Sequence, residues 1–94
     1  METIRLNGKK MTDRKAAHAY LKKKLHLPEY YGNNLHALGD CLTTDFSGKM
    51  IILHDPQTVK NQLGDYGYSL VSLFKEVAAI NSAIRLILVY PLQS

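Results

Sequence analysis

The sequence contains only one cysteine, no long apolar run and none of the short motifs that mark the common enzyme families. The single cysteine, Cys41, excludes an intramolecular disulfide and agrees with the reducing environment of the cytoplasm. The longest apolar stretch, 86–90, is far shorter than the roughly 20 residues that cross a bilayer. Residues 1–10 lack the apolar segment of a secretory signal. We therefore expect a soluble, cytoplasmic protein without a membrane partner.

The missing motifs also argue against catalysis. The chain has no nucleophile elbow, phosphate-binding loop or dinucleotide-binding glycine motif. His36 and Asp40 are four residues apart and share a helical face, but a metal site needs more ligands, and the other histidines lie on other segments. Cys41 stands next to Leu42 on a helix whose leucines face the core, which favours a packing role. We therefore predict no enzyme activity, no metal and no cofactor.

The first half of the chain shows one strand followed by a helix. Residues 2–7 alternate apolar and polar side chains, which predicts a half-buried strand. Thr12 is the expected N-cap of the first helix, whose apolar side chains recur at helical spacing. This helix is expected to end near Leu25, because Pro28 disfavours helical backbone at the residue before it.

The rest of the chain alternates helices and strands. A Gly-Asn-Asn turn at 32–34 precedes a second helix, whose leucines recur on one face. The apolar run Met50–Leu53 has the pattern of a strand covered on both faces. Asp55 and the proline after it predict the start of a short third helix. A longer fourth helix is expected from about Tyr68, and a last strand at 84–90.

These elements follow one another in the order βααβααβ. Strands that are separated by helices favour a parallel sheet with helical crossovers. A length of 94 residues, of which 46% are apolar and 21% charged, suits one globular domain. The sequence therefore predicts an α/β fold, with a small three-stranded parallel sheet and about four helices, in a single domain over 1–94.

Charges of opposite sign occupy different parts of the sequence. The formal net charge is +4, and residues 1–26 contain eight Lys and Arg against two acids. Residues 27–47, in contrast, contain three acids and no Lys or Arg. The run Lys22–Lys24 leaves open a nucleic-acid-binding module on the first helix. However, the run has no interleaved aromatic residues to stack on bases, so we favour a solvated helix face and expect no nucleic-acid partner.

The segment 27–42, LPEYYGNNLHALGDCL, is the best candidate for a binding surface. Tyrosine is enriched in interface hot spots, and Tyr30 and Tyr31 are adjacent here. One of the two could instead fill the end of the core while the other lies on the surface. Gly39 is unexpected inside a helix, where glycine costs about 1 kcal/mol relative to alanine. It either allows close approach of a partner or marks the loss of a side chain.

This segment resembles that of the barstar family, intracellular inhibitors of secreted guanyl-specific ribonucleases. The likeness includes the LPEYYG start and the Asp-Cys-Leu end of 27–42, and it extends to Leu6–Gly8, Leu21–Lys23 and Leu73–Glu76. The resemblance implies a small α/β domain with a three-stranded parallel sheet. It also implies that the second helix and the loop before it enter the active site of a basic secreted ribonuclease or ribonuclease-like toxin, with this chain as a monomer.

The resemblance assigns roles to individual residues. Asp40 would be the central anion that pairs with active-site cations, while Tyr30 and Tyr31 would pack on the enzyme's surface. Contacts or flanking positions would come from Gly32, Asn34, Thr43 and, on the fourth helix, Glu76.

Two positions in the expected contact set depart from the family pattern. His36 replaces an acid and Gly39 replaces a tryptophan, and the chain as a whole is basic where barstar is acidic. We therefore expect a cognate ribonuclease other than barnase as the target. The alternative is a barstar-like scaffold that has been redirected to another protein partner.

Overall fold

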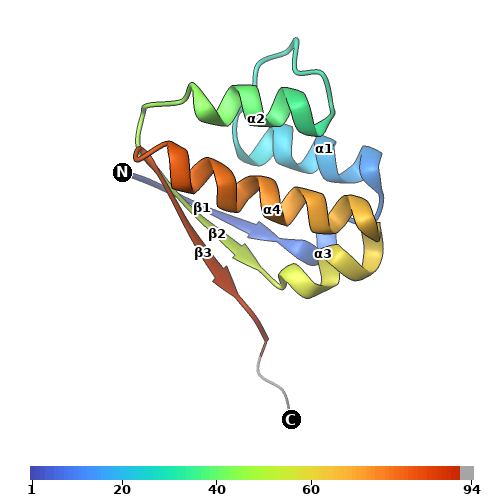
Figure 1. Ribbon diagram of the computed structural model, residues 1–94. Coiled ribbons are helices and arrows are strands. Elements are labelled where there is room, and N and C mark those ends of the chain that lie inside the picture. The colour runs from blue at the N-terminus through green and yellow to red at the C-terminus, as the bar shows by residue number, and fades with distance from the viewer. Residues whose placement is uncertain (92–94) are drawn as a thin grey trace.

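A computed structural model describes residues 1–91 and confirms the predicted α/β fold with a three-stranded parallel sheet and four α-helices. Residues 92–94, the end of the predicted single domain, lie outside the described range. Figure 1 shows the elements in chain order. The strands are β1 (Glu2–Asn7), β2 (Lys49–His54) and β3 (Ile84–Val89). The helices are α1 (Arg14–Lys24), α2 (Leu35–Thr43), α3 (Pro56–Leu63) and α4 (Asp65–Ile80), with a short 3-10 helix, η1 (Gly8–Lys10), after β1.

The strand order β1-β2-β3 determines where the helices lie. Both strand pairs are parallel, so after each strand the chain must run back along the sheet before it forms the next strand. The order β1-β2-β3 means that both of these crossovers move one strand over in the same direction. Because such crossovers are almost always right-handed, both helix pairs are placed on the same face. β1 and β3 accordingly alternate in burial, whereas β2 buries Ile51, Ile52 and Leu53 in succession. Ile4, Ile51 and Leu86 are in register on the helix-covered face. Figure 1 shows the helices gathered on this side of the sheet.

The expectation that β2 is covered on both faces agrees with the burial of three consecutive residues, Ile51, Ile52 and Leu53. Ile52 points away from the helices and is not part of the core cluster, although it is only 8% exposed. Its neighbours in register are Arg5 on β1 and Ile87 on β3, whose side chains flank it. The second face of the sheet therefore has no helical layer, and Ile87 and Val89 remain exposed there.

The core lies between the sheet and the helices. Each helix contributes the apolar face that its spacing predicts, including Leu21 of α1, Leu38 and Leu42 of α2, and Leu70 and Phe74 of α4. Each of these side chains is at most 1% exposed. Burial of one such side chain stabilises the fold by roughly 1.5–3 kcal/mol, so this shared cluster holds the helices in place.

The helix starts differ in detail from the sequence-based expectation. Asp13, not Thr12, caps α1, because its carboxylate accepts a hydrogen bond from the Ala16 amide at 2.8 Å. Asp55 precedes α3 as expected, but its side chain makes no capping bond. Its backbone is left-handed, with φ 63°, which directs the carboxylate elsewhere. The fourth helix begins at Asp65, directly after Gly64, instead of near Tyr68.

Within residues 1–91, no helix combines the length and the apolar character needed to cross a membrane.

Candidate partner-binding surface

The loop before α2 takes its shape from a helix cap. Asn34 is the N-cap of α2, and its Oδ1 accepts a hydrogen bond from the Ala37 amide at 2.8 Å. Its Nδ2 donates to the Gly32 carbonyl at 3.1 Å, which closes the turn over residues 32–34. Gly32 and Asn34 are both exposed, as expected for contact residues. The side chain of Asn34, however, is already engaged in fixing the loop to the helix.

The two adjacent tyrosines have opposite environments. Tyr30 is 87% exposed, whereas Tyr31 is only 5% exposed and belongs to the core cluster. The expectation that Tyr31 packs on the surface of a partner is therefore corrected: its ring fills the end of the core. The reason is a buried hydrogen bond, in which the Tyr31 hydroxyl lies 2.6 Å from Nδ1 of His18. Tyr30 alone remains available as an aromatic contact.

His18 was not singled out by the sequence, yet it anchors the binding loop. It lies on α1, is 2% exposed, and its second ring nitrogen contacts the hydroxyl of Tyr66 on α4. Burial lowers the pKa of His18, so the ring is held neutral, with one nitrogen donating and the other accepting. Burial also raises the pKa values of Tyr31 and Tyr66. The only sequence signal for this anchor is a histidine on the apolar face of α1.

The exposed face of α2 carries Asp40 and His36. Since Leu38 and Leu42 point into the core, these two residues are directed outward by the helical period. Their side chains are 71% and 90% exposed, and His36 Nε2 lies 3.5 Å from Asp40 Oδ2. The sequence prediction that they share one face is thus confirmed. Asp40 is free to meet a cation on a partner, with a histidine beside it.

Thr43 and Gly39 make contacts within the protein, although they were expected to face a partner. The Thr43 hydroxyl donates to the Gly39 carbonyl at 2.8 Å, one turn earlier in the same helix. A Cβ atom at Gly39 would lie 3.3 Å from Cδ1 of Leu73 on α4, which is a tight contact. The glycine therefore permits close packing of α2 against α4.

A groove of about 370 Å³ lies between α2 and α4 beside this contact. Its lining includes Leu35, Tyr68, Leu73 and the exposed acid Glu76. Ser69 and Ser72 complete the lining, so the groove is about as polar as it is apolar. The fold thus brings Glu76, distant in sequence, to the margin of α2.

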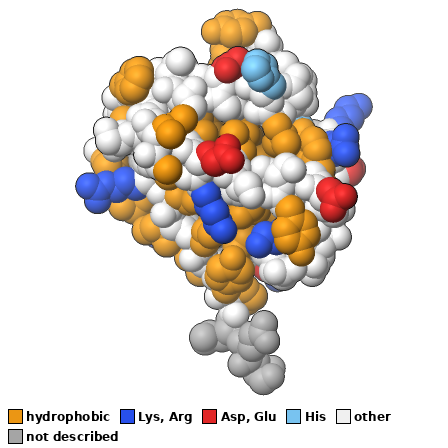
Figure 2. Space-filling view, viewed as in Figure 1, with side chains coloured by type: hydrophobic (Ala, Val, Ile, Leu, Met, Phe, Trp, Pro, Cys, Tyr) orange, Lys and Arg blue, Asp and Glu red, His pale blue; other side chains and the backbone are white. Residues whose placement is uncertain are grey.

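The charge of this surface differs from that of the molecule. Residues 27–47 contain Glu29, Asp40 and Asp45 and no Lys or Arg. In the upper half of Figure 2, acidic side chains and a histidine lie among hydrophobic ones, while most Lys and Arg side chains lie at the sides or below. At one margin, Lys22 pairs with the fully exposed Glu29 at 3.4 Å. We name residues 27–43 together with Glu76 the loop–α2 surface.

The titratable groups of the loop–α2 surface bear on its chemistry. Among residues 1–91, no group of three or more His, Cys, Asp or Glu side chains is placed to hold a metal ion. Burial, and secondarily the neighbouring Asp40, raises the pKa of Cys41, so its thiol stays protonated and is a poor nucleophile. The loop–α2 surface carries an exposed acid, an exposed tyrosine and a groove, with Lys22 at one margin.

The comparison with known families identifies the class more closely. The family described as "Barstar (barnase inhibitor)" matches residues 1–90, and the chain belongs to this family. One relative is a Bacillus subtilis (strain 168) protein named "Putative ribonuclease inhibitor YrdF". It is 46% identical over 43 residues, which cover 46% of this chain and 47% of that protein. The aligned part therefore spans about half of the relative's length.

Proposed function

We propose that this protein is an intracellular inhibitor, or immunity protein, of a basic ribonuclease or ribonuclease-like toxin. In this proposal it is a cytoplasmic monomer without enzyme activity. It blocks the active site of the nuclease with α2 and the preceding loop. Membership of a family of ribonuclease inhibitors supports the general role. The choice of these residues as the binding site rests on the geometry and charge of the loop–α2 surface.

The observation that carries the proposal is the position of Asp40. Its carboxylate is 71% exposed at the centre of α2, on a segment without Lys or Arg. Ribonuclease active sites bind phosphate with cationic side chains, and a carboxylate that is fixed on a helix can take the place of phosphate. Complementary charges of this kind accelerate association and contribute to specificity. Tyr30 then supplies aromatic contact area, and the α2–α4 groove accepts a basic side chain.

The test is stoichiometric inhibition of RNA cleavage by a panel of microbial guanyl-specific ribonucleases, with Asp40→Asn and Glu2→Gln compared. Each variant replaces one exposed acid by its amide, but Glu2 lies on β1, outside the loop–α2 surface. Asp40→Asn should lose at least about 2 kcal/mol of binding free energy, a hot-spot threshold for which the barnase–barstar interface is itself an example. That loss is about 30-fold in Kd.

Glu2→Gln should inhibit as well as the wild type. Equal inhibition by Asp40→Asn and the wild type would show that Asp40 is not part of the binding site.

A redirected binding scaffold is the second candidate. His36 lies 3.5 Å from the carboxylate of Asp40, and Gly39 presents no side chain beyond the backbone. Both features reduce the negative charge and the aromatic area that a barnase-like enzyme would meet. If no ribonuclease in the panel is inhibited, and a non-nuclease protein is captured in an Asp40-dependent way, this candidate replaces the first.

A further inference from the structure

A second site lies at the carboxyl ends of the strands, and the proposed inhibitor role does not use it. A pocket of about 650 Å³ opens there, beyond the ends of β1, β2 and β3. Open α/β sheets bind ligands outside the carboxyl ends of their strands at a point where the strand order reverses, and the order β1-β2-β3 has no such point, so the case for a ligand rests on the lining of the pocket. The volume is within the range of roughly 300–1,000 Å³ that holds a small organic ligand.

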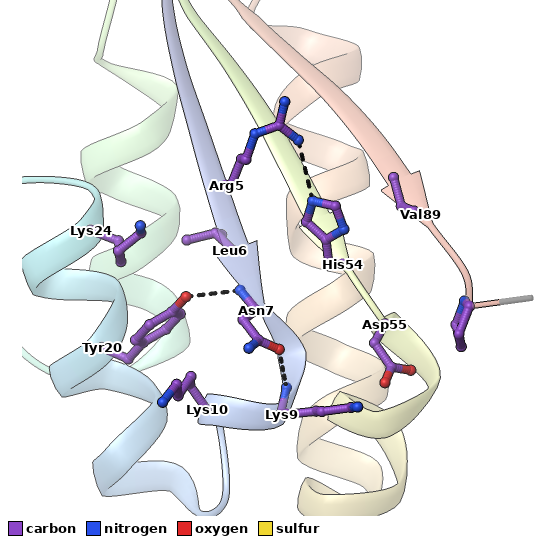
Figure 3. A pocket seen from close by; sticks show the side chains of 11 residues that line it. Arg5, Leu6, Asn7, Lys9, Lys10, Tyr20, Lys24, His54, Asp55 and Val89 are labelled. Carbon is purple, nitrogen blue, oxygen red and sulfur yellow. Dashed lines mark hydrogen bonds between the residues drawn. The ribbon is translucent and has the colours of Figure 1, made fainter.

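The pocket is strongly basic. Four cations line it, namely Arg5 on β1, Lys9 and Lys10 on η1, and Lys24 on α1, against the single acid Asp55 (Figure 3). Within residues 1–91, the ion pairs of the protein involve other side chains, so these four cations have no carboxylate within 4.0 Å. The four cations are exposed, so solvent screens their mutual repulsion, and together they give the pocket a positive potential that attracts anions.

The pocket also has an apolar side. It is formed by Val89 and Pro91 at the end of β3, together with Leu6 and the ring of Tyr20, and the polar residues Asn7 and His54 complete the lining. Tyr20 is held in place because its hydroxyl accepts a hydrogen bond from the Asn7 amide at 2.8 Å. Adjacent strands are about 4.8 Å apart, so a ligand that crosses all three strand ends spans about 10 Å. A ligand of about that length, with an anionic end and an apolar end, matches the basic and the apolar sides of the pocket.

Asp55 gives the pocket a polar acceptor in a fixed position. Its left-handed backbone is uncommon for a residue other than glycine, and its carboxylate is not used to cap α3. Gly8 packs directly against the backbone of Asp55, since a Cβ on Gly8 would clash with the Asp55 carbonyl oxygen. Figure 3 shows the Asp55 side chain on the side of the pocket near Lys9, away from Lys10 and Lys24. Carboxylates in such positions accept hydrogen bonds from ribose hydroxyls.

We propose that this pocket binds a nucleoside polyphosphate. The phosphates lie against Lys9, Lys10 and Lys24. The nucleoside rests on Val89 and Pro91, with its ribose hydroxyls donating to Asp55.

The experiment is calorimetric titration of the full chain at low salt with ADP, with pyrophosphate and with adenosine. Because both halves of the ligand are recognised, ADP should bind at least about tenfold more tightly than either fragment. Equal affinity for ADP and pyrophosphate would overturn the proposal, since it would reduce the pocket to an unspecific anion site. The absence of ADP binding at millimolar concentration would overturn it as well.

Matched charge variants locate the binding. Lys9→Gln/Lys24→Gln removes two pocket cations, and Lys15→Gln/Lys75→Gln removes two exposed lysines that do not line the pocket. The first variant should weaken ADP binding by about tenfold or more, and the second by less than about twofold. Circular dichroism should show that both variants are folded. Equal weakening by the two variants would overturn the assignment.

A single-stranded oligoribonucleotide serves as the third ligand class. If it binds through Lys9 and Lys24 while ADP does not bind, the pocket is an RNA site and the nucleotide proposal is wrong. Inhibition of a ribonuclease is unaffected by either result, because the pocket shares no residue with the loop–α2 surface.

Discussion

At the scale of single residues, His18 is the most informative side chain. It lies between Tyr31, at the base of the binding loop, and Tyr66 at the start of α4, and each hydroxyl contacts one ring nitrogen. The guanidinium carbon of Arg14 lies over the ring of Tyr66, 4.2 Å from the ring centroid. A buried network that is fully hydrogen-bonded in this way fixes one conformation. The orientation of the exposed Tyr30 therefore depends on a residue that never reaches the surface.

The pH dependence of stability should report on His18. Burial lowers its pKa in the folded state, whereas the unfolded chain keeps the ordinary value of 6.5. Below pH 6.5 the unfolded state binds the proton more readily, so the free energy of unfolding falls as the pH is lowered from 6.5 toward the folded-state pKa. Above pH 6.5 the contribution of the neutral ring is fully present.

Urea denaturation at pH 7.5 and pH 5.5 checks this expectation. His18→Gln should cost about 1–3 kcal/mol at the higher pH, because the buried hydroxyls lose partners. It should also flatten the decrease in stability toward pH 5.5. His26→Gln, at a 77% exposed position, should keep the wild-type slope. An unchanged slope in His18→Gln would assign the pH dependence to other groups.

At the scale of secondary-structure elements, α2 is held at both ends by polar contacts and along its length by leucines. Asn34 caps its start, and Asn81, the C-cap of α4, holds its end. The amide of Asn81 is 3% exposed and donates to the carbonyls of Leu42 at 2.8 Å and Asp45 at 2.9 Å. These bonds join the ends of the two helices that form the groove. They fix the position of Asp40 relative to Glu76.

Asn81→Ala should therefore loosen α2 specifically. The variant removes a donor from two carbonyl groups. The Leu42 carbonyl keeps the Asp45 amide as a donor at 3.4 Å, whereas the Asp45 carbonyl loses its donor, which costs about 1–3 kcal/mol. Hydrogen exchange should accelerate at the C-terminal amides of α2 more than in the strands. Ser82→Ala, at the exposed neighbouring position, is the matched control and should leave exchange unchanged. Uniformly faster exchange in all elements would indicate global destabilisation instead.

At the scale of the whole molecule, charge is separated over the surface. The net charge of +4 repels a basic partner, while the loop–α2 surface attracts it. The Debye length is about 8 Å at physiological ionic strength, so the attraction near the contact is felt more strongly than the repulsion from distant lysines. Lysines at the margin of the loop, such as the exposed Lys23, should therefore matter most among the repelling charges.

Lys23→Gln should increase the association rate with a ribonuclease that the protein inhibits. We expect an increase of a few-fold at low salt, which disappears in about 0.5 M salt because a charge at the rim acts mainly on association. Stopped-flow mixing measures the rate directly. Lys15→Gln, near the start of the same helix, has the same charge and should change the rate less. Equal increases in both variants would mean that net charge, and not position, controls association.

The order and type of the elements were determined by the sequence itself, because alternation and helical spacing are local properties. The same local reasoning placed Asp40 and His36 outward, since Leu38 and Leu42 on the same helix must face the core. The family resemblance was likewise contained in the segment 27–42.

The tertiary structure alone decided which partner each side chain meets. Of the two adjacent tyrosines, Tyr31 turned inward because His18, 13 residues earlier, offers it a buried hydrogen bond. Asp55 has a left-handed backbone and makes no capping bond to α3, while its amide donates to the Val89 carbonyl of β3 at 2.7 Å. The basic pocket exists because a parallel sheet brings three strand ends together from distant parts of the chain. Contacts of this kind depend on the packing of whole elements, which no local pattern contains.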